Sequence, residues 1–186
     1  FTAATPQDSG GNTWVVQIGD LDGDGDLDAS TANSSSGNGA INLGNGDGTF
    51  RDVTNSSGVG GATLPYSGWS TRFVDYDNDG WKDIFVTQGH VMDTIEKTSP
   101  NLSYRQPPLL LRNQAARFVR VTLGEVFRTD WAGRGAAFGD LDNDGDIDVI
   151  TSNLGQKAVV LRNDGGNGRR WLGIHTIGKS SNRDGI

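Results

Sequence analysis

The sequence predicts an all-β protein built from repeated units of four antiparallel strands. Three observations lead to this prediction. A nine-residue pattern, Asp-x-Asp-x-Asp-Gly-x-x-Asp, occurs three times, at residues 20–28, 75–83 and 140–148. After each copy the chain alternates as a β-strand does, and a second short strand recurs further downstream. The same order of features in all three places indicates structural repeats, with the aspartate-rich segment between the first and second strand of each unit.

We name the three copies loop 1 (20–28), loop 2 (75–83) and loop 3 (140–148), and we number their positions 1 to 9. Side chains at positions 1, 3 and 5 of such a loop converge on one point, and the side chain at position 9 closes the shell. Glycine at position 6 permits the sharp turn, and position 7 offers its backbone carbonyl. The predicted ligands are Asp20, Asp22, Asp24, Asp26 and Asp28 in loop 1, Asp75, Asp77, Asp79, Trp81 and Asp83 in loop 2, and Asp140, Asp142, Asp144, Asp146 and Asp148 in loop 3.

This donor set suits a hard cation. The chain has no cysteine, and its only histidines are His90 and His175, which argues against zinc or copper. Four carboxylates held close together repel one another, so metal binding and local folding should be coupled. Solvated Asp-Gly turns are the alternative explanation, but three copies in register disfavour it. The sequence therefore predicts about three calcium ions.

An EF-hand or dockerin loop shares the first half of this pattern and needs a bidentate acid at position 12 between two helices. Position 12 is Thr31, Val86 and Thr151 in the three copies. The residues after each loop, 28–33, 83–88 and 148–153, alternate as strands do. We therefore expect the loops to join β-strands.

Other positions repeat in register with the loops. Before the loops stand Ile18, Phe73 and Phe138, and further upstream Trp14, Trp69 and Arg134. After the loops come Leu-x-Asn at 43–45, 111–113 and 161–163, and final strands at 50–54, 118–122 and 171–175. Turns at 45–48 and 163–166 would join the third and fourth strands. These repeated segments together predict four strands in each unit.

A repeat of this length with four short strands is typical of a β-propeller blade, and about three blades would form a partial propeller. The predicted units are residues 10–60, 61–125 and 126–178, preceded by the last strand of an earlier blade at 1–9. The middle unit carries an inserted loop at about 88–107, with one helical turn expected near 92–97. This loop is either a recognition element or a passive surface excursion.

Composition limits the function further. The net charge is −7, and only Glu96 and Glu125 of the 23 acidic residues are glutamates, so the acidity belongs mainly to aspartate. No basic stripe is present, which disfavours a nucleic-acid partner. No apolar stretch is long enough for a membrane span. Loops this acidic suit the millimolar calcium outside cells, so we expect an extracellular, secreted or cell-surface protein.

The segments around loops 1 and 3, Gly19-Asp-Leu-Asp-Gly-Asp-Gly-Asp-Leu-Asp28 and Phe138-Gly-Asp-Leu-Asp-Asn-Asp-Gly-Asp-Ile-Asp148, resemble the FG-GAP/VCBS repeats of calcium-binding propellers of the integrin-alpha type. The tail, 171–186, resembles the start of an ASPIC/UnbV domain, as in cartilage acidic protein and bacterial secreted proteins. These resemblances imply a calcium-stabilised scaffold with seven or so blades in the parent fold.

The sequence thus favours a non-enzymatic scaffold for adhesion or for binding protein or glycan at a cell surface or matrix. One alternative is a self-assembling fibre or shell protein, in which open blade edges make the contacts. Another is the propeller of a calcium-dependent polysaccharide lyase, but no motif joins its candidate residues, which are His90, His175, Lys97 and Arg134. Trp131 and Tyr66 could stack on sugars, although core packing is the favoured role.

Overall fold

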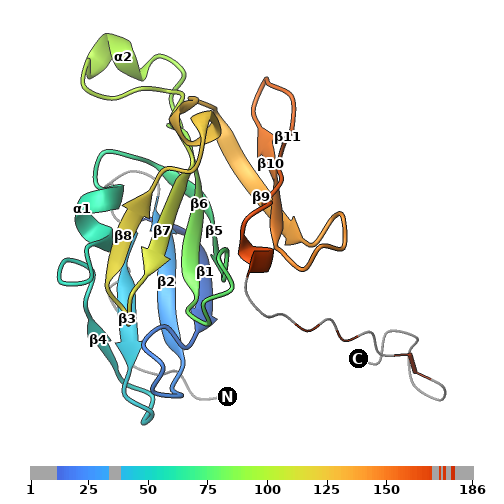
Figure 1. Cartoon of the computed structure of the whole chain (residues 1–186). Coiled ribbons are helices and arrows are strands. Elements are labelled where there is room, and N and C mark those ends of the chain that lie inside the picture. Colours follow the sequence, from blue (N-terminus) through green and yellow to red (C-terminus); the bar gives the residue numbers. More distant parts are fainter. Residues whose placement is uncertain (1–11, 34–38, 169–171, 173, 175–176, 179–186) are drawn as a thin grey trace.

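The computed structural model describes residues 12–33, 39–168, 172, 174, 177 and 178, and over these residues the protein is all-β with few helices. Its described strands form three antiparallel sheets, each with its strands side by side in chain order (Figure 1). Sheet 1 contains β1 (Thr13–Gly19), β2 (Asp28–Asn33), β3 (Ile41–Gly44) and β4 (Phe50–Asp52). Sheet 2 contains β5 (Gly68–Val74), β6 (Asp83–Gln88), β7 (Leu109–Asn113) and β8 (Phe118–Val121). Sheet 3 contains β9 (Gly133–Gly139), β10 (Asp148–Asn153) and β11 (Val159–Leu161).

The strands predicted after the loops are confirmed. β2, β6 and β10 each begin at the position 9 aspartate and end where the alternation ends. The final strands predicted at 50–54 and 118–122 are present as β4 and β8. The predicted strands at the two ends, within 1–9 and at 171–175, lie wholly or largely outside the described residues. The unit boundaries at 10–60, 61–125 and 126–178 stay predictions.

The Leu-x-Asn alignment of the first unit is wrong by one residue. Pairing with the second strand places Asn42 at the position of Leu111 and Leu161. Gly44 therefore corresponds to Asn113 and Asn163, whereas Asn45 lies in the hairpin turn, where its N–H bonds the carbonyl of Thr49. A side chain at Gly44 would collide with the backbone of Leu27, so this strand end needs glycine.

Among the described residues, four short helical segments accompany the sheets: α1 (Val59–Thr63), α2 (Ile95–Thr98), η1 (Glu125–Arg128) and η2 (Gly166–Gly168). Only α2 was expected, as the helical turn of the inserted loop, and it begins three residues later than predicted. Figure 1 shows α2 projecting beyond the end of the sheets. None of the helices among the described residues is long and apolar enough to cross a membrane.

Sheets 1 and 2 pack face to face around the larger core. Its fully buried members include Leu21 of loop 1, Ile41 of β3, Ile84 of β6 and Leu109 and Leu111 of β7. The alternation of the strands places these side chains on facing sides of the two sheets. The stacked pair of sheets is therefore the most completely packed part of the described protein.

A second core joins sheets 2 and 3. Phe85 lies at its centre, with edge-to-face contacts to Phe138 at 5.6 Å and Phe127 at 6.3 Å between ring centroids. Beside these rings lies a largely apolar cavity of about 500 Å³, lined among others by Val149 and Val160. Sheet 3 is thus less fully packed than its two neighbours.

The first strands of the sheets lie next to one another, β1 beside β5 and β5 beside β9. Three side chains that the sequence aligned form a stack across them. Trp14 stacks on Trp69 with centroids 4.9 Å apart, and the guanidinium of Arg134 lies 4.2 Å from the centroid of Trp69. Because aromatic stacking and cation–π contacts both favour this arrangement, the stack holds the three strands in register.

Asparagine side chains bridge neighbouring sheets close to the loops. Asn113 at the end of β7 is almost completely buried and donates to the carbonyls of Leu21 (2.8 Å) and Lys82 (3.0 Å). Asn163 after β11 donates to the carbonyl of Tyr76 (2.7 Å). Each asparagine thus satisfies the position 2 carbonyl in the loop of the preceding sheet.

We expect Asn113→Ala to lower the free energy of unfolding by about 2–3 kcal/mol, because it leaves buried carbonyls without their donor. The matched variant Asn163→Ala, at a half-buried position, should cost about 1 kcal/mol. Urea unfolding of both variants measures the difference. Equal effects would contradict the assignment of Asn113 as the more deeply buried bridge.

Candidate metal centres

Each aspartate-rich loop joins the first and second strands of its sheet, as predicted. Loop 1 lies between β1 and β2, loop 2 between β5 and β6, and loop 3 between β9 and β10. Glycine at position 6 has φ of +91°, +92° and +95° in the three loops, a conformation that disfavours any residue with a side chain. The three loops therefore make the same turn.

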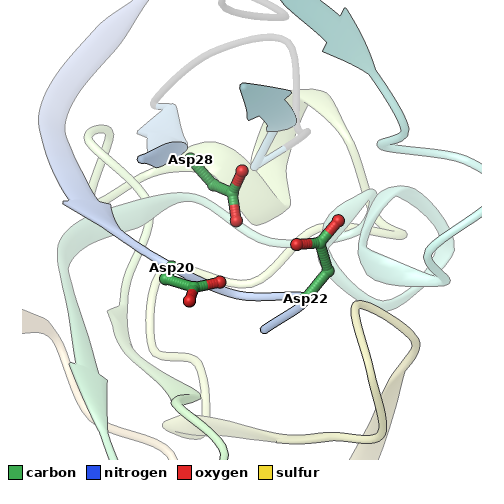
Figure 2. A group of neighbouring side chains, drawn as sticks. All are labelled: Asp20, Asp22 and Asp28. Atoms are coloured by element: carbon green, nitrogen blue, oxygen red, sulfur yellow. The ribbon is translucent and has the colours of Figure 1, made fainter. Parts of the chain in front are cut away.

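The turn brings the carboxylates at positions 1, 3 and 9 together. Figure 2 shows the carboxylates of Asp20, Asp22 and Asp28 facing a shared space. In each loop one oxygen from each of these three residues lies within 4.8 Å of the others; the groups are Asp20, Asp22 and Asp28, then Asp75, Asp77 and Asp83, then Asp140, Asp142 and Asp148. This convergence of oxygens fits a hard divalent cation.

The aspartate at position 9 ties each loop to its sheet. Asp28, Asp83 and Asp148 are at most 1% exposed. One carboxylate oxygen accepts the N–H of position 2, from Leu21, Tyr76 and Leu141 at 2.6–3.1 Å. The other accepts the N–H at the end of the third strand, from Gly44, Asn113 and Asn163 at 2.8 Å. One side chain thus fixes both the loop and the neighbouring strand.

Positions 1 and 5 shape the turn itself. The position 1 carboxylate accepts the N–H of the position 6 glycine at 2.8–3.1 Å in every loop. The position 5 carboxylate accepts the N–H of position 7 at 2.8–3.0 Å. Asp24 and Asp79 are not in the groups of converging carboxylates, and Asp144 belongs to a separate group with Asp142 and Asp164. The predicted role of position 5 as a ligand is therefore not tested by this geometry.

Residues at position 7 connect one loop to the next. The ring of Trp81 in loop 2 lies against Gly23 of loop 1. Asn78 of loop 2 donates to the carboxylate of Asp146 in loop 3 at 3.0 Å, and Asp146 is almost completely buried. The backbone carbonyls of position 7 stay predicted ligands. The loops thus form a contiguous row along one edge of the sheets.

Residues 20–86 match the family model of the FG-GAP-like repeat. The match begins at position 1 of loop 1 and ends within β6, so it contains loops 1 and 2. It supports the predicted FG-GAP/VCBS resemblance over that segment. No curated protein matches the chain. The ASPIC/UnbV resemblance of 171–186 stays a prediction.

Burial works against ionisation of carboxylates in these aspartate-rich loops. It raises the pKa of the Asp83 carboxyl to about 7, although the N–H donors of Asn113 and Tyr76 lower it in part. Burial also raises the pKa of Asp28. For Asp142, burial and then the negative charges of Asp144 and Asp148 raise the pKa. A divalent cation in such a loop would favour the carboxylate form, so metal and protons compete.

Sequence analysis missed two cationic side chains beside the loops. Arg112 lies 3.0 Å from Asp77 and 3.1 Å from Asp79 through its Nη2 atom. Arg162 forms an ion pair with Asp164 at 2.7 Å. A signal was present, because the tripeptide Leu-Arg-Asn occurs at 111–113 and again at 161–163.

Of the catalytic candidates, the structure brings His90 and Arg134 into direct contact. His90 Nδ1 accepts the N–H of Met92, and Arg134 donates to the carbonyls of Gly133 and His90. Lys97 lies in α2 of the projecting loop, and His175 lies outside the described residues. Trp131 is buried, as the packing role predicted, and Tyr66 lies under the guanidinium of Arg120 at 5.3 Å.

The raised pKa of Asp83 predicts a distinctive pH dependence of the metal-free protein. In the unfolded chain this pKa is about 4. The native state binds the extra proton, so the stability contribution of Asp83 is complete below about pH 4 and is lost as the pH rises through about 7. The melting temperature in chelator should therefore fall between pH 5 and pH 8 for wild type.

Asp83→Asn is the matched control, because it is neutral at every pH and should flatten this dependence. Saturating calcium should also offset the loss at pH 8. A wild-type melting temperature that rises from pH 5 to pH 8 in chelator, in parallel with that of Asp83→Asn, would contradict the assignment.

Proposed function

We propose that this chain is a calcium-binding scaffold whose three sheets are blades of a β-propeller. The adjacency of β1, β5 and β9 supports the blade arrangement, because propeller blades place their first strands around a common axis. The loops along one edge would then each hold one ion. The scaffold would work outside the cell or at its surface, in adhesion or in the binding of protein or glycan, and without catalysis.

The observation that carries this proposal is the threefold recurrence of one loop geometry. In each copy three carboxylates converge, a left-handed glycine makes the turn, and a buried aspartate joins the loop to the sheet. A solvated turn has no need to bury its last carboxylate, since an isolated buried charge is unfavourable. A bound divalent cation would supply the missing counter-charge.

Calcium is the cation that best fits this donor set. All side-chain donors are carboxylate oxygens, which hard cations prefer, and no histidine is among them. Calcium accepts six to eight oxygens in flexible geometry, whereas magnesium demands a near-octahedral shell and keeps its waters. Loops with several carboxylates and a position 7 carbonyl satisfy the calcium requirement more readily.

The inserted segment between β6 and β7 is the best candidate for partner recognition. It projects beyond the sheets and carries α2 (Figure 1). Val91 and Met92 expose almost half of their surface there. The segment is anchored, because Gln106 exchanges backbone hydrogen bonds with Trp131 and the N–H of His90 bonds the carbonyl of Tyr104. A projecting loop on a rigid base is a common way to present a binding surface.

Calorimetric titration with calcium tests the proposal. Asp22→Asn and Asp142→Asn change position 3 in loops 1 and 3, where the buried position 9 aspartate remains intact. Each variant should weaken calcium binding at its own loop by about tenfold or more and leave the other loops unchanged, because affinity follows the number of charged ligands. Asp93→Asn, an exposed aspartate outside the loops, is the matched control for charge.

We expect the thermal stability of wild type to fall when calcium is removed. Calcium binding by Asp22→Asn and Asp142→Asn that equals that of wild type would contradict the assigned ligands. Binding that is lost equally in Asp93→Asn would show a general charge effect in place of specific sites.

One observation favours self-assembly as a second candidate function. Trp14, Val16 and Ile18 of β1 are 55%, 50% and 64% exposed among the described residues. At the position of Ile18 in the other sheets, Phe73 and Phe138 pack against the preceding sheet. The exposed apolar side chains on the outer face of sheet 1 are therefore typical of a surface that another protein molecule covers.

If this face mediates assembly, Ile18→Asp should lower the average particle mass measured by light scattering at high protein concentration. Leu64→Asp, an equally exposed apolar residue near α1, is the matched control and should leave the mass unchanged. A wild-type protein that stays monomeric at every concentration would exclude the assembly.

A further inference from the structure

The third strand of each sheet places one side chain beside the loop of that sheet. Strand pairing shows that Leu43, Arg112 and Arg162 occupy equivalent positions. Each directly precedes the residue whose N–H binds the position 9 aspartate. The three loops share the turn and the carboxylates at positions 1, 3, 5 and 9. They differ in charge at position 7, which is Trp81 in loop 2 and aspartate in loops 1 and 3, at Lys82 of loop 2, and at this third-strand residue.

Arg112 lies against the acidic groups of loop 2. Its Nη2 atom is 3.0 Å from Asp77 Oδ2 and 3.1 Å from Asp79 Oδ2, which are positions 3 and 5 of the loop. The side chains of Asp77 and Asp79 are 21% and 10% exposed, so the contact is partly shielded from water. A single guanidinium nitrogen thus bridges two of the carboxylates that a cation would bind.

The residue at this position is arranged differently beside the other two loops. Leu43 beside loop 1 is uncharged and buried in the core between sheets 1 and 2. Arg162 beside loop 3 forms a two-point contact with Asp164, through Nε at 2.7 Å and Nη2 at 3.1 Å, and both side chains are about 60% exposed. Arg162 is thus paired with Asp164, and its positive charge also partly offsets the raised pKa of the Asp142 carboxyl in loop 3.

We propose that Arg112 is a built-in counter-ion of loop 2, which calcium must displace, so that loop 2 is the weakest of the three calcium sites. This inference rests on the proposed calcium-binding function. In the metal-free protein the guanidinium relieves the repulsion between the carboxylates of loop 2. Loops 1 and 3 then fill at low calcium, and loop 2 fills only at higher calcium.

The geometry indicates that Arg112 is a replaceable occupant. Arginine binds a carboxylate most strongly through two parallel N–H groups, but here Nη2 alone makes both contacts. The Nε atom of Arg112 is buried and has no hydrogen-bond partner among the described residues. A divalent ion carries twice the charge and contacts three carboxylates at once. Calcium binds only those molecules in which Arg112 has left loop 2. The apparent calcium affinity of loop 2 is therefore the intrinsic affinity multiplied by the fraction of such molecules.

The test isolates loop 2 in the full chain. In a background with Asp22→Asn and Asp142→Asn, the calcium affinity of loop 2 is measured by calorimetry with Arg112 and with Arg112→Leu, which reproduces the residue of loop 1. We expect Arg112→Leu to raise the affinity about tenfold or more. Arg112→Lys keeps the charge and should leave the affinity within about threefold of that of Arg112. Arg162→Leu is the matched control; it is measured at loop 3 in a background with Asp22→Asn and Asp77→Asn, and it should have a smaller effect.

Thermal melting separates this role from a merely structural one. Arg112→Leu should lower the melting temperature in chelator, because the carboxylates of loop 2 then lack a counter-charge, and should leave it unchanged or higher in saturating calcium. An arginine that only packs would lower both temperatures alike. That result would overturn the inference, and so would a calcium affinity of loop 2 that Arg112→Leu leaves unchanged. In either case, calcium binding at loops 1 and 3 would still support the proposed function. Absence of binding in every loop would overturn both.

Discussion

The buried aspartate at position 9 is the interaction on which the rest of the structure depends. Asp28, Asp83 and Asp148 each accept one N–H from the loop and one from the end of the third strand. The same aspartate is also the first residue of the second strand, and its carboxylate faces the shared space of the loop. Since a charged group this deeply buried is costly unless it is compensated, a cation bound in the loop would stabilise the fold, and the fold would in turn hold the cation.

The loops also form a connected row. Asn113 and Asn163 bond the position 2 carbonyls of the preceding loops, and Trp81 and Asn78 reach directly into neighbouring loops. A change in one loop is therefore felt at the next sheet through short contacts. The row is not uniform, however, because Arg112 contacts the acids of loop 2 whereas loop 1 has an apolar leucine in that place. Loops that share this motif would thus differ in cation affinity.

Sequence pattern predicted the parts that repeat. The loops and the strands that begin at position 9 recur at fixed spacing, so alignment of the copies was enough to find them. The alignment also gave Trp14, Trp69 and Arg134 as equivalent positions, but only the structure shows that they stack. The one-residue error at 43–45 arose because Leu-x-Asn was matched by letters, while the strand end requires Gly44 next to Leu27. Arg112 was missed because the repeated Leu-Arg-Asn tripeptide does not show its partners, Asp77 and Asp79, which lie far upstream in the sequence. The helices α1 and η1 have no repeated pattern and so gave no signal.

Hydrogen exchange of backbone amides, with chelator and with calcium, tests the central claim most directly. The N–H groups of Leu21, Tyr76 and Leu141, which bond the position 9 aspartates, should be protected in both conditions. The N–H groups of Gly25, Gly80 and Gly145, in the exposed turns, should gain strong protection only with calcium. Equal exchange of these glycines in both conditions would contradict the claim that a cation completes the loops.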